Sequence, residues 1–306
     1  MNNETVLKLT QLTKTYKKVN AVDHVNITIN KGDIYGLVGK NGAGKSTLLK
    51  LITSLAKQDS GEIELFGETT YAGLQKSRKR MGSVIETPAL YVDLSAEHNL
   101  EYYQRLKGVP NKKVIHDTLE LVGLTDTGKK KVKNFSLGMK QRLGLAVALL
   151  NNPDFLILDE PLNGLDPMGI VEMRGLIIKL SQEHQITIMI SSHLLSELSL
   201  VATHYGFINN GKMINEATAE DIAEACQRSL SIKVKDVNKA SSAIETTLKT
   251  RKYKAVSANE IRLYDYIDRP DLVNQKLMEA NIKVMGITEI GDNLEDYFVN
   301  LLKEEK

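Results

Sequence analysis

Several features that would place a chain in a specialised class are scarce or missing in this sequence. Its 306 residues include a single cysteine, Cys226, which excludes a disulfide within the chain and suits a reducing cytoplasm. The formal net charge is only +2, so bulk electrostatics give no argument for a nucleic-acid partner. The apolar runs at 143–150 and 187–190 are too short to span a bilayer, and the N-terminal segment lacks the regions of a signal peptide. We therefore expect a globular protein that reaches a membrane only by docking onto another chain.

The hydrophobic pattern divides the chain into two parts. Up to about residue 217, short apolar runs alternate with helical patterns, which predicts an α/β fold with a mainly parallel sheet. The runs at 155–158 and 186–190 are continuous, as in central strands that are covered on both faces. In residues 218–306 the expected order is β-α-β-β-α-β, followed by a last helix at 294–302. This order indicates a small ferredoxin-like α+β domain.

Local patterns add detail to the first part. Residues 5–30 contain short β-like stretches with a turn-rich segment between them. The pattern turns helical from Ser95 to about residue 123, and a long helix is expected at 136–150. The sequence therefore predicts a mainly helical segment before the strand at 155–158.

A glycine-rich run between Gly39 and Thr47 is the most informative motif. It reads Gly-Lys-Asn-Gly-Ala-Gly-Lys-Ser-Thr, follows a strand candidate and leads into a helical pattern. Such an arrangement forms a phosphate-binding P-loop, in which backbone N–H groups and the helix dipole face the anion. Lys45 is expected to reach the β- and γ-phosphates, and the Ser46 hydroxyl to bind Mg²⁺. The residues expected to bind the nucleotide here are Gly39, Asn41, Gly42, Ala43, Gly44, Lys45, Ser46 and Thr47.

Two acidic residues follow the apolar run at 155–158. Asp159, at the end of the expected strand, can hold Mg²⁺ beside Ser46, directly or through water. Glu160 is placed to polarise an attacking water as a general base. Taken alone, two such acids are more commonly the solvated end of a strand, so their assignment depends on the motifs around them.

Ser136 and His193 are candidates because of their place in the chain. Ser136 is a good helix N-cap, and its hydroxyl with the following N–H groups would form a second anion site, although a capped helix without a ligand is commoner. His193 follows the strand candidate at 186–190 and can donate a hydrogen bond to a γ-phosphate. A lone histidine is usually structural, but this one lies at the expected mouth of the same sheet.

Together these motifs resemble those of the ATP-binding subunit of an ABC transporter. Gly39 to Thr47 resemble the Walker A motif, and residues 155–160 the Walker B motif with its catalytic glutamate. The resemblance also implies roles for residues outside the Walker motifs. These are an ABC signature at 136–139 with Ser136 and Gly138 binding nucleotide, a D-loop at 163–166, a switch histidine at His193, and an adenine-stacking aromatic at Tyr16.

The resemblance covers roughly residues 5–217 and implies the organisation of the fold. We expect an ABC ATPase domain at 1–217, with an N-terminal antiparallel β subdomain and a helical subdomain at about 87–153. Residues 218–306 would form a small accessory domain, either a regulatory unit that senses a ligand or an appendage that stabilises a dimer.

Two departures from the general family pattern point to one branch of the family. The usual Leu-Ser-Gly-Gly-Gln signature is Phe-Ser-Leu-Gly-Met at 135–139, and the glutamine that normally reaches Mg²⁺ is replaced by Glu86. A glutamate there can still bind the metal, but it adds a negative charge near phosphates. Both departures, and the motif Asn-Leu-Glu-Asp-Tyr-Phe at 293–298, resemble the bacitracin-resistance and lantibiotic-immunity branch of bacterial exporters.

The resemblance implies an ATPase that uses ATP and Mg²⁺ to power export, or clearance from the membrane, of an antimicrobial peptide or other amphiphile. The chain would lie at the cytoplasmic face of the membrane, where residues around 86–103 would contact separate transmembrane permease subunits. A second ATPase copy would complete each ATP site. No nucleic-acid partner is expected. The alternative is an ABC ATPase acting on ribosomes or DNA, which the single cassette and the balanced charge disfavour.

Overall fold

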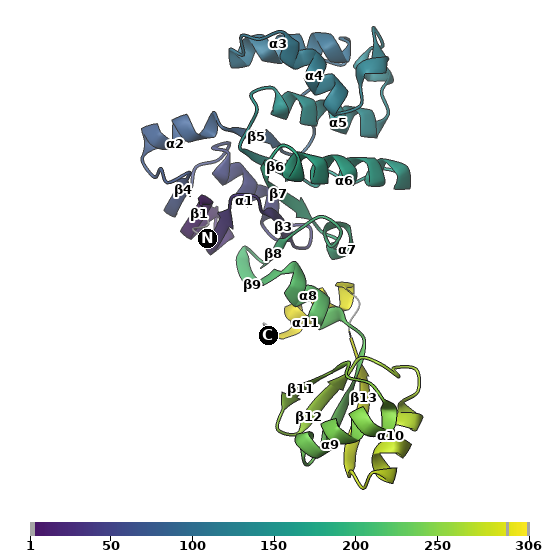
Figure 1. Cartoon of the computed structure of the whole chain (residues 1–306). Helices are drawn as coiled ribbons and strands as arrows, with labels where there is room; N and C mark the ends of the chain where they lie inside the picture. Colours follow the sequence, from purple (N-terminus) through teal and green to yellow (C-terminus); the bar gives the residue numbers. More distant parts are fainter. Residues whose placement is uncertain (1–3, 292–293, 305–306) are drawn as a thin grey trace. The chain divides into compact units, whose positions relative to one another are not determined.

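A computed structural model describes residues 4–291 and 294–304, and Figure 1 shows the elements in chain order. The described chain separates into two compact units: Glu220–Lys303 form the second, and the residues up to Ala219, together with Glu304, belong to the first. Asn293, where the C-terminal motif begins, lies outside the described residues. No described helix combines the length and the apolar character that a membrane crossing requires.

The first unit is built on a six-stranded sheet in which only the last pair of neighbours is antiparallel. Its strands, in spatial order, are β5 (Met81–Val84), β6 (Phe155–Asp159), β7 (Thr187–Ser192), β3 (Ile34–Val38), β8 (His204–Asn209) and β9 (Lys212–Thr218). Every residue of β3, β6 and β7 is buried, as expected for parallel strands covered on both faces. The mainly parallel sheet predicted from the apolar runs is therefore confirmed.

An antiparallel sheet completes the β structure of this unit. It has the order β2 (Val19–Asn30), β1 (Thr5–Tyr16) and β4 (Ser60–Leu65). The turn-rich segment expected within residues 5–30 is wrong in extent, because β1 and β2 continue as 12-residue strands. The register shifts between Leu9 and Leu12, and Gln11 takes a left-handed φ of 50° in this bulge. A bulge of this kind lets the strand continue through a stretch whose hydrophobic pattern is irregular.

Helices cover the sheet or form a separate group. In the chain, α1 (Lys45–Ile52), α2 (Tyr71–Arg78), α6 (Pro167–Gln182) and α7 (Leu195–Leu198) alternate with the strands. The helices α3 (Ala96–Lys107), α4 (Lys113–Leu121) and α5 (Leu137–Leu149) lie together in Figure 1. The short helical turns η1 (Thr125–Thr127) and η2 (Val132–Asn134) come between α4 and α5 in the chain. The helical pattern expected from Ser95 to residue 123 is interrupted, because α3 ends at Gly108 with a left-handed φ of 68°. Pro110, two residues later, disfavours helical backbone at the residue before it.

The second unit has the element order expected from the sequence. Its elements are α8 (Ala219–Cys226), β10 (Ser229–Val234), α9 (Val237–Ala243), η3 (Ile244–Leu248), β11 (Tyr253–Ser257), β12 (Glu260–Leu263), α10 (Pro270–Glu279), β13 (Val284–Ile290) and α11 (Leu294–Glu304). The strands form an antiparallel sheet in the order β11-β12-β10-β13. Leu230, Ile232 and Val273 belong to one buried cluster between this sheet and its helices. The predicted α+β unit is therefore present.

Candidate functional site

The glycine-rich loop joins β3 to α1, and close packing requires some of its glycines. Gly44 has a φ of 112°, and a Cβ there would lie 2.4 Å from the carbonyl oxygen of Ala21. A Cβ on Gly39 would lie 2.5 Å from the carbonyl oxygen of Ile208. Gly42 also has a positive φ, 83°, but a Cβ there would meet nothing within 4 Å. The loop is therefore packed closely against the chain at Gly39 and Gly44 and is open at Gly42, where a phosphate can approach the backbone.

Lys45 occupies the first position of α1 and is 5% exposed. Its ammonium Nζ donates to the carbonyl oxygen of Gly39 at 2.6 Å and lies 3.1 Å from Oε1 of Glu160. The first turn of α1 contains no acidic side chain, and no side chain caps its N–H groups. A buried cation beside uncapped helix N–H groups suits a polyphosphate, so these residues fit ATP.

Asp159 and Glu160 are held in place by Ser191 on the neighbouring strand β7. The Ser191 hydroxyl donates to Oδ1 of Asp159 at 2.6 Å and accepts the backbone N–H of Glu160 at 2.9 Å. Glu160 has a left-handed φ of 49°, which is costly for a residue with a Cβ. The strand therefore turns sharply after Asp159, and two consecutive acids are presented at one end of the sheet.

Glu160 contacts two of the other predicted residues. Its Oε1 lies 3.1 Å from Nζ of Lys45, and its Oε2 lies 2.8 Å from Nδ1 of His193. The side chains of Glu160 and His193 are 20% and 30% exposed, so both remain accessible to water. The structure thus brings together the predicted phosphate-binding lysine, the predicted general base and the predicted switch histidine.

The predicted magnesium ligands are Ser46, Asp159 and Glu86. Ser46 follows Lys45 on α1, and Asp159 ends β6. Glu86 lies in the loop after β5 and forms an ion pair with Lys50, with 2.6 Å between Oε1 and Nζ. In the described part of the chain no group of three or more histidine, cysteine or acidic residues could hold a metal. Mg²⁺ commonly takes one or two protein oxygens and completes its shell with phosphate and water, and a serine hydroxyl with a carboxylate fits that pattern.

Tyr16 is the last residue of β1 and is 49% exposed. The ammonium of Lys14 lies 5.3 Å from the centre of its ring. An exposed aromatic ring with a cation beside it leaves a face on which a base can stack. Adenine stacking at Tyr16 stays a prediction.

Ser136 and Gly138 lie at the start of α5, where Ser136 is the N-cap and accepts the N–H of Met139 at 3.2 Å. Among the described residues, no hydrogen bond or ion pair joins either of them to the glycine-rich loop. A Cβ on Gly138 would meet nothing closer than Leu165, at 3.6 Å. Packing inside the chain therefore does not require a glycine at 138, and Ser136 at the N-terminus of α5 is exposed.

Two residues of this region were missed in the sequence. Ser191 is a polar residue within a fully buried strand, and that contrast was an available signal. Lys50 stands four residues after Ser46 on α1, which places the two side chains on one helix face. Its partner Glu86 lies far away in the sequence, so only the structure reveals their contact.

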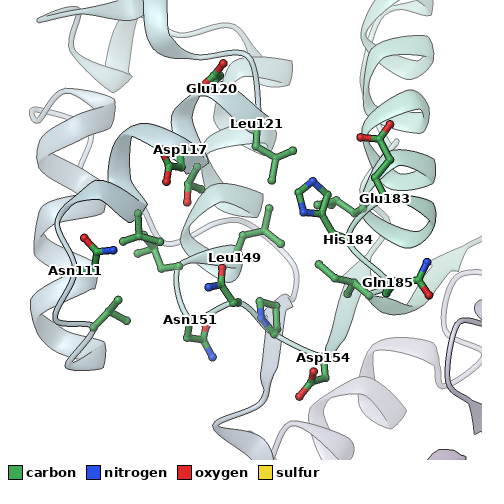
Figure 2. A pocket seen from close by; sticks show the side chains of 18 of the residues that line it. Asn111, Asp117, Glu120, Leu121, Leu149, Asn151, Asp154, Glu183, His184 and Gln185 are labelled. Carbon is green, nitrogen blue, oxygen red and sulfur yellow. The ribbon is translucent and has the colours of Figure 1, made fainter.

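A separate cleft of about 1120 Å³ lies away from these residues (Figure 2). It is lined by α4, the ends of α5 and α6, and the segments that precede β6 and β7. Asp117, Glu120 and Glu183 are among the acidic residues that line it. None of the predicted site residues lines this cleft, because it lies at the ends where β6 and β7 begin.

Comparisons with known proteins agree with this geometry. A family model described as "ABC transporter" matches residues 22–163. A bacitracin transport ATP-binding protein of Bacillus licheniformis is 43% identical over 298 residues, which cover 97% of each chain. A lantibiotic transport ATP-binding protein of Streptococcus pyogenes is 46% identical over 214 residues, which cover 69% of this chain and 90% of the relative.

Solved structures of ABC transporter proteins are also similar to this chain. An ATP-binding cassette dimer in a post-hydrolysis state, bound to ADP and phosphate, matches with a TM-score of 0.63 and 27% identity, over 70% of this chain and 98% of that one. A Clostridium perfringens protein that is part of an ABC transporter complex matches with a TM-score of 0.65 and 27% identity, over 72% of this chain and 91% of that one. The chain therefore belongs to the ABC transporter family, as an ATP-binding subunit that hydrolyses ATP with Mg²⁺.

Proposed function

We propose that this ATPase powers the export, or the clearance from the membrane, of an antimicrobial peptide or other amphiphile through separate permease chains. The observation that carries the proposal is the extent of the match to the bacitracin transport protein, which covers 97% of both chains and thus includes the second unit. A linearmycin resistance ATP-binding protein of Bacillus subtilis, 31% identical over 310 residues, is a further relative named for resistance to an antimicrobial. No described feature favours the alternative of an ATPase acting on ribosomes or DNA.

Glu160 is proposed as the general base of hydrolysis. Its carboxylate is partly exposed and is oriented by contacts on both oxygens, with Lys45 on one side and His193 on the other. Lys45 would bind the phosphates, while Ser46, Asp159 and Glu86 would hold Mg²⁺, which neutralises phosphate charge when bound. His193 then lies next to both the base and the expected position of the γ-phosphate, so its hydrogen bonds change when that phosphate leaves.

The ATP site is proposed to be completed by a second copy of the chain. The N-terminus of α5, with Ser136 and Gly138, has an exposed anion-binding geometry, but in the described part of the chain no hydrogen bond or ion pair joins it to the chain's own glycine-rich loop. The related cassette is a dimer, and a head-to-tail pair would place α5 of one copy over the phosphates bound by Lys45 of the other. ATP would then join the two copies, and hydrolysis would release them.

The permease is proposed to dock near the Glu86 loop. Tyr91 and Tyr102 are each 43% exposed, their ring centres are 4.5 Å apart, and Val92 beside them is 48% exposed. The buried side chain of Asn99 holds this segment, because it accepts the N–H of Tyr91 and donates to its carbonyl oxygen. Exposed aromatic side chains on a fixed backbone are typical of protein interfaces. The permease contact would place the chain at the cytoplasmic face of the membrane.

The two parts of the chain are proposed to have different roles. We propose residues 1–217 as the ATPase domain, with a helical subdomain at about 87–153, and residues 218–306 as an accessory domain. All the predicted nucleotide-site residues belong to the first of these ranges. The α+β unit of the second is proposed to support regulation or dimer formation.

Susceptibility of living cells tests the proposed function. Deletion of the gene should lower the bacitracin concentration that stops growth, and the wild-type gene should restore resistance. Glu160→Gln, produced at the same level, should fail to restore it, because binding without hydrolysis cannot power export. An antibiotic that acts on the ribosome serves as the comparison. Unchanged bacitracin susceptibility with changed susceptibility to the ribosomal antibiotic would replace the proposal by the alternative.

A further inference from the structure

The loop that contains Glu86 is attached to the Walker A helix by an ion pair. Glu86 follows β5 and has a left-handed φ of 60°, an unfavourable backbone conformation for a glutamate. Its Oε1 accepts from Nζ of Lys50 at 2.6 Å. Lys50 lies one helical turn beyond Ser46 on α1, so its side chain shares a helix face with this proposed magnesium ligand.

Lys50 interacts electrostatically with two further predicted site residues besides Glu86. The hydrogen bond to Glu86 raises the pKa of the Lys50 ammonium above its ordinary value, and the nearby Tyr16 and Asp159 add to the rise.

The same loop also packs against the helix that starts at Ser136. A Cβ on Gly144 in α5 would lie 2.5 Å from Cβ of Pro88, so Gly144 allows the close approach of Pro88. The hydroxyl of Tyr103 on α3 donates to the carbonyl oxygen of Ala89. The Lys50–Glu86 pair thus connects α1 to a loop that the helical elements hold on its other side.

We propose that Lys50 is a positioning residue that acts through Glu86, neutralising this carboxylate and holding it beside the magnesium site. The proposal rests on the proposed role of Glu86 as a magnesium ligand. The lysine counter-ion lets the Glu86 carboxylate occupy this position without adding net charge near the phosphates.

The proposal predicts opposite effects for the two partners. Lys50→Met leaves the Glu86 carboxylate uncompensated, and its repulsion of the phosphates should weaken nucleotide binding. Glu86→Gln leaves the Lys50 ammonium uncompensated and should tighten it. For unit charges several ångströms apart in a partly exposed site, each change corresponds to about three- to tenfold in the dissociation constant. The double variant should return close to the wild-type value.

Equilibrium binding of trinitrophenyl-ATP to the full-length chain at low salt, first at one Mg²⁺ concentration and then over a Mg²⁺ series, measures these effects as binding rather than as turnover. The wild type, both single variants and the double variant are compared, and thermal unfolding shows that each is folded. Lys57→Met is the matched control, because Lys57 is exposed, lies shortly after α1 and has no ion pair among the described residues. It should leave the dissociation constant unchanged. High salt should reduce the differences, because the interaction is electrostatic.

Two results would overturn the proposal. Lys50→Met could leave the dissociation constant unchanged both in the wild-type chain and in the chain that already carries Glu86→Gln. That result is expected for a surface ion pair that contributes little free energy. Alternatively, the two single changes could have the same sign and simply add, which would mean that each acts independently. If Glu86 has no role at the metal, Glu86→Gln should leave the Mg²⁺ dependence of binding unchanged, and that result would instead refute the proposed role of Glu86.

Discussion

Replacing Glu160 by glutamine tests the catalytic assignment most sharply, because the two functions of this carboxylate should respond in opposite directions. In the structure Oε1 of Glu160 lies 3.1 Å from Nζ of Lys45, the group proposed to bind the phosphates. A glutamine has the same shape but no charge, so it cannot act as a base. It also no longer competes with the phosphates for the lysine.

The expected sizes follow from these contacts. Loss of a general base commonly lowers turnover by about 10²–10⁴-fold, which is about 3–5 kcal/mol of barrier. A hydrogen bond to a charged group contributes about 1.5–3 kcal/mol, and the loss of part of it frees Lys45 for the phosphates. We therefore expect ATP to bind about fivefold more tightly to Glu160→Gln, equivalent to about 1 kcal/mol.

Two assays separate these effects. Phosphate release measures turnover, and binding of a fluorescent ATP analogue measures affinity. Glu183→Gln is the control, because Glu183 lines the distant cleft of Figure 2 and should change neither quantity. Turnover within tenfold of the wild type would remove Glu160 from the mechanism. Weaker ATP binding by Glu160→Gln would show that its carboxylate does not compete with the phosphates for Lys45.

Three further predictions concern two residues that hold the site in place and the proposed permease contact. Ser191→Ala removes the hydroxyl that binds Asp159 and the N–H of Glu160, so the free energy of unfolding should fall by about 2 kcal/mol in urea titrations; an unchanged midpoint would contradict this. Gly44→Ala places a Cβ 2.4 Å from the carbonyl oxygen of Ala21 at a φ of 112°, so the melting temperature and ATP binding should both fall; wild-type ATP affinity would show that the loop adapts. Tyr91→Ala should lower recovery of the permease with the affinity-tagged chain, whereas Tyr71→Ala, at an exposed position on α2, should not; equal recovery would place the permease contact elsewhere.

Local sequence signals predicted much of the fold. The continuous apolar runs identified the buried strands β6 and β7, because parallel strands covered on both faces need apolar residues throughout. The glycine-rich run identified the loop before α1, because few other structures need that residue pattern. Ser95 and Ser136 identified helix starts, since a serine hydroxyl can satisfy an exposed N–H group there.

The parts that were missed depend on contacts between distant residues. The break between α3 and α4 at Gly108 interrupts a hydrophobic pattern that would also fit one long helix. The left-handed backbone of Glu160 becomes visible only once Ser191 on β7 is seen to hold its N–H. The ion pair between Lys50 and Glu86 spans 36 residues, and no periodicity in the sequence encodes such a contact.

The most direct measurement is a cross-link between two copies of the chain, because each ATP site is proposed to combine the loop of one copy with α5 of another. The chain has one cysteine, so Cys226→Ser provides a background for Asn41→Cys and Leu137→Cys, both at exposed positions. With Mg²⁺ and a non-hydrolysable ATP analogue, a short thiol cross-linker should join the two variants, when mixed, into a species of twice the 34.1 kDa chain mass. ADP should give little of this product, and neither variant alone should give it efficiently. Equal yields with ADP and with the ATP analogue, or no cross-linked dimer at all, would contradict a shared ATP site.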